Sequence, residues 1–177
     1  LKKKILSNLN IVYSNRPSED YDLFVRLAMN YQFYEIPQFL VKVRVRPDSL
    51  CGLGWDTIKE DIDSIRLNQL TYLDLNPDKR ESDIHLALID KDYEKLLKYP
   101  LKEVFIWITK MIKKNDYCKI FNKSYFDNEL KFRALNLLKN KKSIKICDII
   151  NYKFLSKKLL TSYTFRELLY LYRYNKD

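Results

Sequence analysis

The stretch from Ser18 to Ser49 constrains the fold of this chain more than any other part of the sequence. It opens with acidic residues and continues through Leu23–Met29, a run that is apolar except at Arg26. Acidic residues suit the first turn of a helix because the free N–H groups and the macrodipole favour negative charge there, and Ser18 is a favourable N-cap residue. We therefore predict a helix here. Its apolar character on all sides predicts that this helix is buried.

Arg26 lies four residues after Asp22 in the predicted helix. Residues at this spacing are neighbours on a helix surface, so the two side chains can form an ion pair. A guanidinium among apolar side chains needs a partner of this kind. Asp22 is the nearest candidate for that role.

The segment Phe39–Arg46 alternates between apolar and basic residues, which predicts a strand. With a period of two, Lys42, Arg44 and Arg46 share one face, and same-face neighbours on a strand lie about 6.5–7 Å apart. Cations at that spacing suit a polyanion such as a diphosphate, because Arg can grip its oxygens with two donors. The residues Tyr31–Ile36 are a candidate neighbouring strand.

These residues, SEDYDLFVRLA followed by EIPQFLVKVRV and a closing DS, resemble the acceptor-side half of family 2 glycosyltransferases of the GT-A fold. The resemblance implies an inverting enzyme in which the Asp of an acidic pair deprotonates the acceptor hydroxyl. By position that residue is Asp20, with Glu19 as the alternative. The family commonly writes the strand as Tyr-Arg-x-His; Arg44 matches the Arg, whereas Arg46 stands where the His would be.

The candidate site therefore contains catalytic and substrate-binding residues but no metal ligand. The catalytic candidates are Asp20 and Glu19, and the substrate-binding candidates are Arg44, Arg46, Lys42 and Arg26. Each has a simpler interpretation, because acidic residues in a first turn usually serve the helix itself and a basic strand face is usually the solvated side of a sheet. The conjunction of these features within one short stretch favours the enzymatic interpretation.

The resemblance implies a fold that is mainly α with a small β component. We expect residues 1–54 to be the C-terminal part of a GT-A catalytic domain and residues 55–177 to be an α-helical extension with a basic tail. The joint is expected at 51–54, which holds both glycines of the chain. The donor-binding half of the family, with the strands and the metal-binding Asp-x-Asp that belong to it, is not recognisable here, so we expect a fragment that neither binds nucleotide sugar nor turns over alone.

For the full-length enzyme, the resemblance implies a nucleotide-sugar donor and a glycan or lipid-linked acceptor, as in cell-surface polysaccharide or glycolipid synthesis. A divalent cation, Mg²⁺ or Mn²⁺, is expected there, with no cofactor in this part of the chain. The three cysteines lack zinc-site or disulfide spacing, which favours buried thiols in a cytoplasmic protein. We expect a cytoplasmic location, with peripheral attachment to the inner face of the cell membrane as a candidate.

Charge is distributed unevenly along the chain. Residues 1–100 carry 15 Lys and Arg against 16 Asp and Glu, whereas residues 101–177 carry 18 against 7. Basic and aromatic residues crowd the segment 139–174, which makes an anionic membrane surface a candidate partner; a solvated helical face is an equally weighted alternative. A non-catalytic helical module that docks a membrane or a nucleic acid is the rival function. Nucleic acid is less favoured because the aromatic residues alternate with Leu and Ile at helical spacing.

The rest of the chain shows helical periodicity. We predict a helix from a capping pattern at Thr57 to about Leu73, a break at Asn76–Pro77, a helix after Pro100, and a helix capped by Ser124 that runs to Leu138. The core candidates of the helix after Pro100 are Val104, Phe105, Ile108, Met111 and Ile112. Further helices are expected near 146–160 and 164–174. His85 and Trp107 are predicted to be structural.

Overall fold

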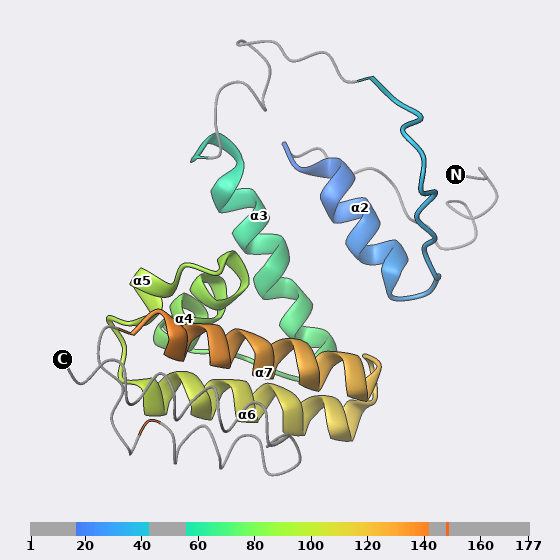
Figure 1. Ribbon diagram of the computed structural model, residues 1–177. Helices are drawn as coiled ribbons and strands as arrows, with labels where there is room; N and C mark the ends of the chain where they lie inside the picture. Colours follow the sequence, from blue (N-terminus) through green and yellow to red (C-terminus); the bar gives the residue numbers. More distant parts are fainter. Residues whose placement is uncertain (1–16, 43–55, 142–147, 149–177) are drawn as a thin grey trace. The chain divides into compact units, whose positions relative to one another are not determined.

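The computed structural model describes residues 17–42, 56–141 and 148, and these are mainly helical. In chain order the elements are α2 (Glu19–Ala28), α3 (Asp56–Asn68), the 3₁₀ helix η1 (Gln69–Leu73), α4 (Lys79–Asp90), α5 (Tyr93–Leu96), α6 (Leu101–Cys118) and α7 (Lys123–Lys139) (Figure 1). The predicted mainly helical fold is confirmed. The predicted helices near 146–160 and 164–174 lie outside the described residues, apart from position 148.

The chain divides into two compact units, Leu1–Gln69 and Leu70–Asp177, which we call the N-terminal and the C-terminal unit. The predicted joint at 51–54 lies outside the described residues and stays a prediction. Each unit is described by itself below.

Helix α2 of the N-terminal unit has one buried face rather than an apolar surface covered on all sides. Leu23 and Leu27 are almost inaccessible, whereas the Phe24 side chain is 49% exposed. The buried leucines are four residues apart, so they lie on one stripe of the helix, and α2 contacts α3, which buries Ile62 and Ile65. The prediction of a fully buried helix was therefore wrong. One neighbouring helix covers one stripe, and the opposite side stays in solvent.

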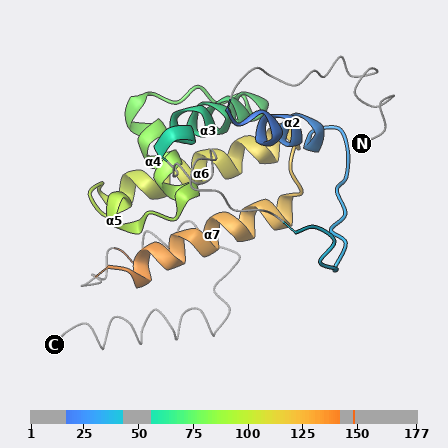
Figure 2. The same cartoon turned by 90° about the horizontal axis from the view of Figure 1, so that it is seen from above.

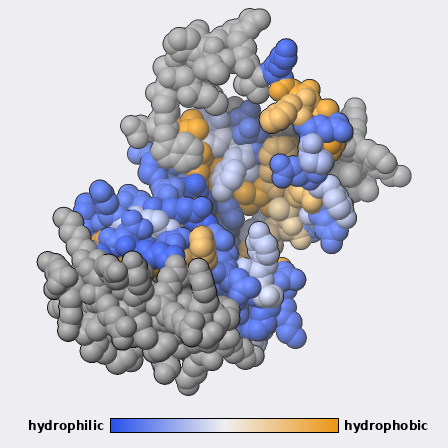
Figure 3. Space-filling model, in the orientation of Figure 1, coloured by the Kyte–Doolittle hydropathy of each residue, from blue (hydrophilic) through white to orange (hydrophobic). Residues whose placement is uncertain are grey.

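The residues that follow α2 form no strand in the described part of the chain. The predicted strand Phe39–Arg46 is described only as far as Lys42, and neither that part nor Tyr31–Ile36 is a strand. These predictions were wrong for the described residues, because a strand needs a hydrogen-bonded neighbour. The backbone bonds of this segment are local, from Tyr31 N–H to Leu27 O at 2.9 Å and from Gln38 N–H to Ile36 O at 2.7 Å. Every residue from 31 to 42 is exposed, and Figure 3 shows hydrophobic atoms on this surface.

Helix α6 lies at the centre of the C-terminal unit. It lies beside α7 in an antiparallel pair and also contacts α4, while α5 contacts α4 and α7 (Figure 2). Its buried residues are Leu101, Val104, Phe105, Trp107, Ile108, Met111 and Asn115. The core predicted after Pro100 is thus confirmed at four of its five positions, and Ile112 is only partly buried.

Helix α4 begins and ends at well-defined caps. The Asp78 carboxylate accepts a hydrogen bond from the Glu81 N–H at 2.8 Å, and the Glu81 side chain accepts one from the Asp78 N–H, which completes a capping box. The break predicted at Asn76–Pro77 is confirmed, since the helix starts just after it. At the other end, the Arg133 guanidinium of α7 donates to the carbonyls of Leu88 and Ile89 at 2.7 and 2.9 Å.

Replacement of Arg133 by Met is expected to destabilise the C-terminal unit. The variant keeps an aliphatic side chain but loses both hydrogen bonds to the end of α4, together with the ion pair to Glu129. Hydrogen bonds from charged donors contribute about 1.5–3 kcal/mol, and we expect a loss of about that size in the free energy of unfolding in urea. Lys102→Met on the exposed side of α6 is the control, with an expected change below about 0.5 kcal/mol. Equal stability of the two variants would contradict this role for Arg133.

Candidate functional site

The predicted catalytic carboxylates lie at the first turn of α2. Ser18 is the N-cap residue, as predicted, and its carbonyl accepts a hydrogen bond from the Asp22 N–H at 3.0 Å. Glu19 is half-buried and Asp20 is exposed. The Ser18 side chain makes no capping hydrogen bond, so its hydroxyl does not contribute to the cap. Its Oγ is buried without a hydrogen-bond partner among the described residues.

A carboxylate of α3, in the same unit, accepts a hydrogen bond at the start of α2. The Ser18 N–H donates to Asp61 Oδ2 of α3 at 3.0 Å, across 43 positions of the sequence. This bond places negative charge at the positive end of the α2 dipole, where it is stabilising. It also ties the start of α2 to α3, which fixes the position of Glu19 and Asp20 relative to that helix.

Asp22, the third acidic residue of this turn, forms an ion pair within α2. Asp22 and Arg26 form the predicted ion pair at 2.9 Å. Both side chains are partly shielded from solvent, with exposed fractions of 17% and 30%. Arg26 lies about two turns from Glu19 along α2, since a helix has 3.6 residues per turn.

Asp20 differs from Asp22 because no basic side chain of the described residues pairs with it. Its Oδ1 accepts a hydrogen bond from the adjacent Tyr21 N–H at 2.7 Å, and its side chain is open to solvent. Of the predicted substrate-binding residues, Lys42 is exposed, and Arg44 and Arg46 lie outside the described residues. The structure thus brings Glu19 and Asp20 together in one turn. The predicted basic strand face beside them is not part of the described structure.

The described residues contain no group of three or more His, Cys, Asp or Glu side chains that could hold a metal ion. They therefore do not provide a site for the divalent cation expected of the full-length enzyme, and that cation stays a prediction.

Sequence reasoning missed a basic face on α6. An open depression of about 570 Å³ is lined by Asp74, Lys110, Lys113, Lys114 and Tyr117. Lys113 and Lys114 lie three and four positions after Lys110 and four and three before Tyr117, a spacing that places these residues along one side of the helix and could have revealed the site. Asp74 belongs to the loop after η1 and has a positive φ of 53°.

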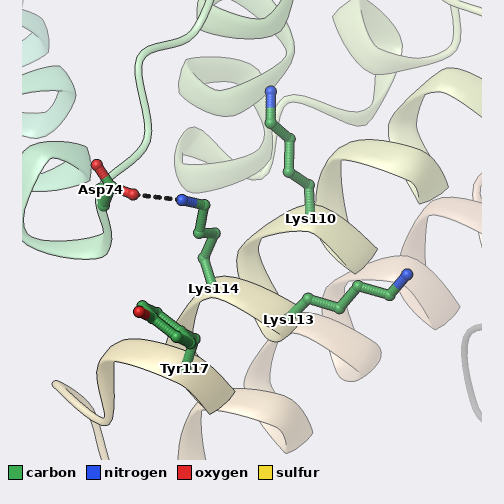
Figure 4. Close-up of a pocket in the computed structure, with 5 residues that line it drawn as sticks. All are labelled: Asp74, Lys110, Lys113, Lys114 and Tyr117. Carbon is green, nitrogen blue, oxygen red and sulfur yellow. Dashed lines mark hydrogen bonds and ion pairs between the residues drawn. The ribbon is translucent and has the colours of Figure 1, made fainter.

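Two of these lysines, Lys110 and Lys114, form ion pairs with different carboxylates. Lys114 donates to Asp74 Oδ2 at 2.5 Å; its hydrogen bond and charge lower the pKa of the Asp74 carboxyl, and Asp74 in turn raises the pKa of Lys114. Lys110 pairs with Glu81 at 2.8 Å and lies over the Trp107 ring at 5.3 Å. Figure 4 shows the three lysines pointing in different directions, with only Lys114 directed at Asp74. This arrangement is a basic surface rather than a cradle that surrounds one anion.

His85 belongs to the core of the C-terminal unit. It is buried, and its Nδ1 accepts a hydrogen bond from Trp107 Nε1 at 3.4 Å. The two rings meet edge to face with their centroids 5.8 Å apart. The predicted structural roles of His85 and Trp107 are confirmed.

Replacement of Asp61 by Ala is expected to loosen the start of α2. The variant leaves the Ser18 N–H without its acceptor and removes the negative charge from the helix end. A hydrogen bond to a charged group contributes about 1.5–3 kcal/mol, so amide hydrogen exchange should become faster by a factor of about 10–100 in α2. Exchange in α6 is the internal control and should not change. Unchanged protection of α2 in the variant would show that this bond does not hold the helix.

The Asp74–Lys114 pair is expected to make stability depend on pH at its two extremes. The folded-state pKa of Asp74 is lowered from 3.8, so its contribution is present at neutral pH and is lost as the pH falls through the lowered value. The pKa of Lys114 is raised from 10.5, so the pair is also lost at high pH. Asp74→Asn removes the charge and keeps a residue that tolerates positive φ.

Urea unfolding of the wild type and Asp74→Asn across this pH range measures the effect. The small stability difference between them should be present at neutral pH and should vanish in strong acid. A difference that persists unchanged below the pKa of Asp74 would mean that the ion pair is not its cause.

No family model, curated protein or solved structure matches this chain. Among the residues that the structure describes, no helix combines the length and the apolar character needed to cross a membrane. The function is therefore argued from the residues and their geometry.

Proposed function

We propose that this chain supplies the acceptor side of an inverting family 2 glycosyltransferase of the GT-A fold, with Asp20 as the base. The observation that carries the proposal is the availability of the Asp20 carboxylate. It is exposed in the first turn of α2, and its one hydrogen bond within the described residues comes from the adjacent Tyr21 N–H. Asp22, three positions after Glu19 in the same motif, is engaged by Arg26 and is not available in this way.

A base must also be held in place, and α2 is anchored at more than one point. The buried leucines Leu23 and Leu27 hold one face of the helix, and the bond from the Ser18 N–H to Asp61 holds its start. A carboxylate on an anchored helix keeps its position relative to an incoming hydroxyl, and this positioning accounts for a large part of enzymatic rate enhancement. Glu19 is half-buried, which makes it the second candidate.

In the proposed reaction the Asp20 carboxylate takes the proton from an acceptor hydroxyl. The acceptor oxygen forms a bond to the anomeric carbon of the sugar as the bond from that carbon to the diphosphate oxygen breaks. The leaving nucleoside diphosphate carries away the electron pair. Arg44 and Arg46, with Lys42, would balance its developing charge; this part of the proposal depends on the sequence and the family resemblance, because both arginines lie outside the described residues.

The partners follow from this reaction. The donor is a nucleotide sugar, the acceptor is a glycan or a lipid-linked hydroxyl, and a divalent cation serves the donor side of the complete enzyme. A lipid-linked acceptor would place the sugar-transfer reaction at the inner face of the cell membrane. The basic segment 139–174 would attach the protein to that surface. The rival function, a binding module without chemistry, requires none of these residues to be catalytic.

Replacement of Asp20 by Asn in the enzyme that contains this segment tests the proposal. Loss of a general base typically lowers turnover by about 10²–10⁴-fold, and binding of the nucleotide-sugar donor should be almost unchanged because the carboxylate acts on the acceptor. Both are measured by sugar transfer and by calorimetry with the donor. Glu19→Gln should lower turnover much less.

Glu94→Gln is the matched control, since Glu94 is an exposed acidic residue in the first turn of α5. Its turnover should equal that of the wild type. If Asp20→Asn turns over as fast as the wild type, Asp20 is excluded as the base. If the unmodified enzyme that contains this segment transfers no sugar, the binding module is favoured.

A further inference from the structure

The turn that joins α6 to α7 exposes large apolar and aromatic side chains. Tyr117 and Tyr125 are 83% and 79% exposed, and Ile120 between them is 41% exposed. The turn lies at one end of the antiparallel α6–α7 pair (Figure 1). Half of the exposed large hydrophobic side chains found in the described part of the C-terminal unit fall within these nine positions. We call residues 113–125 the α6–α7 tip.

The exposure of these side chains is fixed by an ordered turn. The buried Asn115 side chain donates to Phe121 O at 3.1 Å and accepts from the Phe121 N–H at 2.9 Å. The Phe121 and Phe126 rings stack with their centroids 5.2 Å apart, and the Asn122 side chain caps α7 by accepting from the Tyr125 N–H at 3.1 Å. The phenylalanines occupy the positions of a hydrophobic staple, which fixes the angle at which the chain enters a helix. The tip therefore holds its two tyrosines outward.

The tip is also strongly basic. It contains four lysines and one aspartate, a formal charge of +3. Lys114 pairs with Asp74, and Lys123 pairs with Asp116 and Asp127. Lys113 and Lys119 are exposed and have no carboxylate partner within the described part of the chain. These two cations are the ones available to an external anion.

The combination fits an extended anionic surface better than a single small anion. Lys113 and Lys114 of the tip point in different directions (Figure 4), so these two cannot hold one phosphate group between them. A bilayer presents many phosphates in a plane, which diverging lysines can reach separately. Tyrosine is enriched where bilayers meet water, because its ring prefers the apolar side and its hydroxyl the polar side, and basic side chains are attracted to the negative surface of anionic lipids.

We propose that the α6–α7 tip docks this protein on an anionic phospholipid bilayer, with Tyr117, Ile120 and Tyr125 in the headgroup region and Lys113 and Lys119 on lipid phosphates. This surface differs from the basic segment 139–174 and does not depend on the glycosyltransferase function.

Sedimentation of the 177-residue chain with vesicles tests the proposal. Vesicles of phosphatidylcholine with about one third phosphatidylserine should bind the chain, those of phosphatidylcholine alone should not, and added salt should weaken binding. Lys113→Gln/Lys119→Gln should bind about 30-fold more weakly, as expected for two lysines near an anionic leaflet. Tyr117→Ser/Tyr125→Ser should also bind more weakly while keeping the same charge.

Lys98→Gln/Lys102→Gln is the matched control, because it removes the same charge from exposed positions away from the tip. Its binding should stay within about twofold of the wild type, since basic residues act only near the surface that they contact. An equal loss in the control would assign binding to net charge and overturn the proposal. Tighter binding to a single-stranded oligonucleotide, lost with the same lysines, would overturn it in favour of nucleic acid.

Discussion

The burial of one face of α6 is the interaction on which the C-terminal unit depends. Val104, Trp107 and Ile108 of that face are almost inaccessible to solvent, and α4 and α7 both contact the helix. Each fully buried side chain of this kind contributes about 1.5–3 kcal/mol by leaving water, more than the exposed ion pairs at the edge of the unit can contribute. Because a helix has a single periodicity, the burial of this face leaves Lys113 and Tyr117 on the outside. The basic surface is thus a consequence of how the core is packed.

The same periodicity made the interior of this unit predictable from the sequence, whereas the boundaries of its helices were less so. The apolar stripe of α6 and the break before α4 depend on local patterns, and both were predicted. The start of α7 was predicted at Ser124, but Asn122 is the cap. The deciding contacts are the stacking of Phe121 on Phe126 and the bonds of Asn115 to the turn. Several polar residues near a helix start can serve as caps, and only the packing of the turn selects one.

The predicted strand failed for a related reason. Alternation of apolar and basic residues shows which side chains would share a face, but it does not supply the neighbouring strand that a ladder needs. In the described residues 39–42 no such neighbour is present. The prediction that α2 is buried on all sides failed in the same way, because apolar residues allow burial without providing a partner for each face. Phe24 instead meets Phe33 edge to face at 6.0 Å, near the surface.

The first turn of α2 shows how far local sequence can distinguish carboxylates with different surroundings. Acidic residues at the start of a helix usually stabilise it, and the sequence allows this interpretation for both Asp20 and Asp22. Asp22 is bound to Arg26, a contact predicted from its spacing. Asp61, far away in the sequence, supplies charge to the start of α2 through the Ser18 N–H, a contact that no local pattern could predict. Asp20 accepts the Tyr21 N–H of the first turn, so the stabilising interpretation applies to it as well. Its side chain is nevertheless exposed and is not engaged by a basic side chain of the described residues, which is the difference between Asp20 and Asp22.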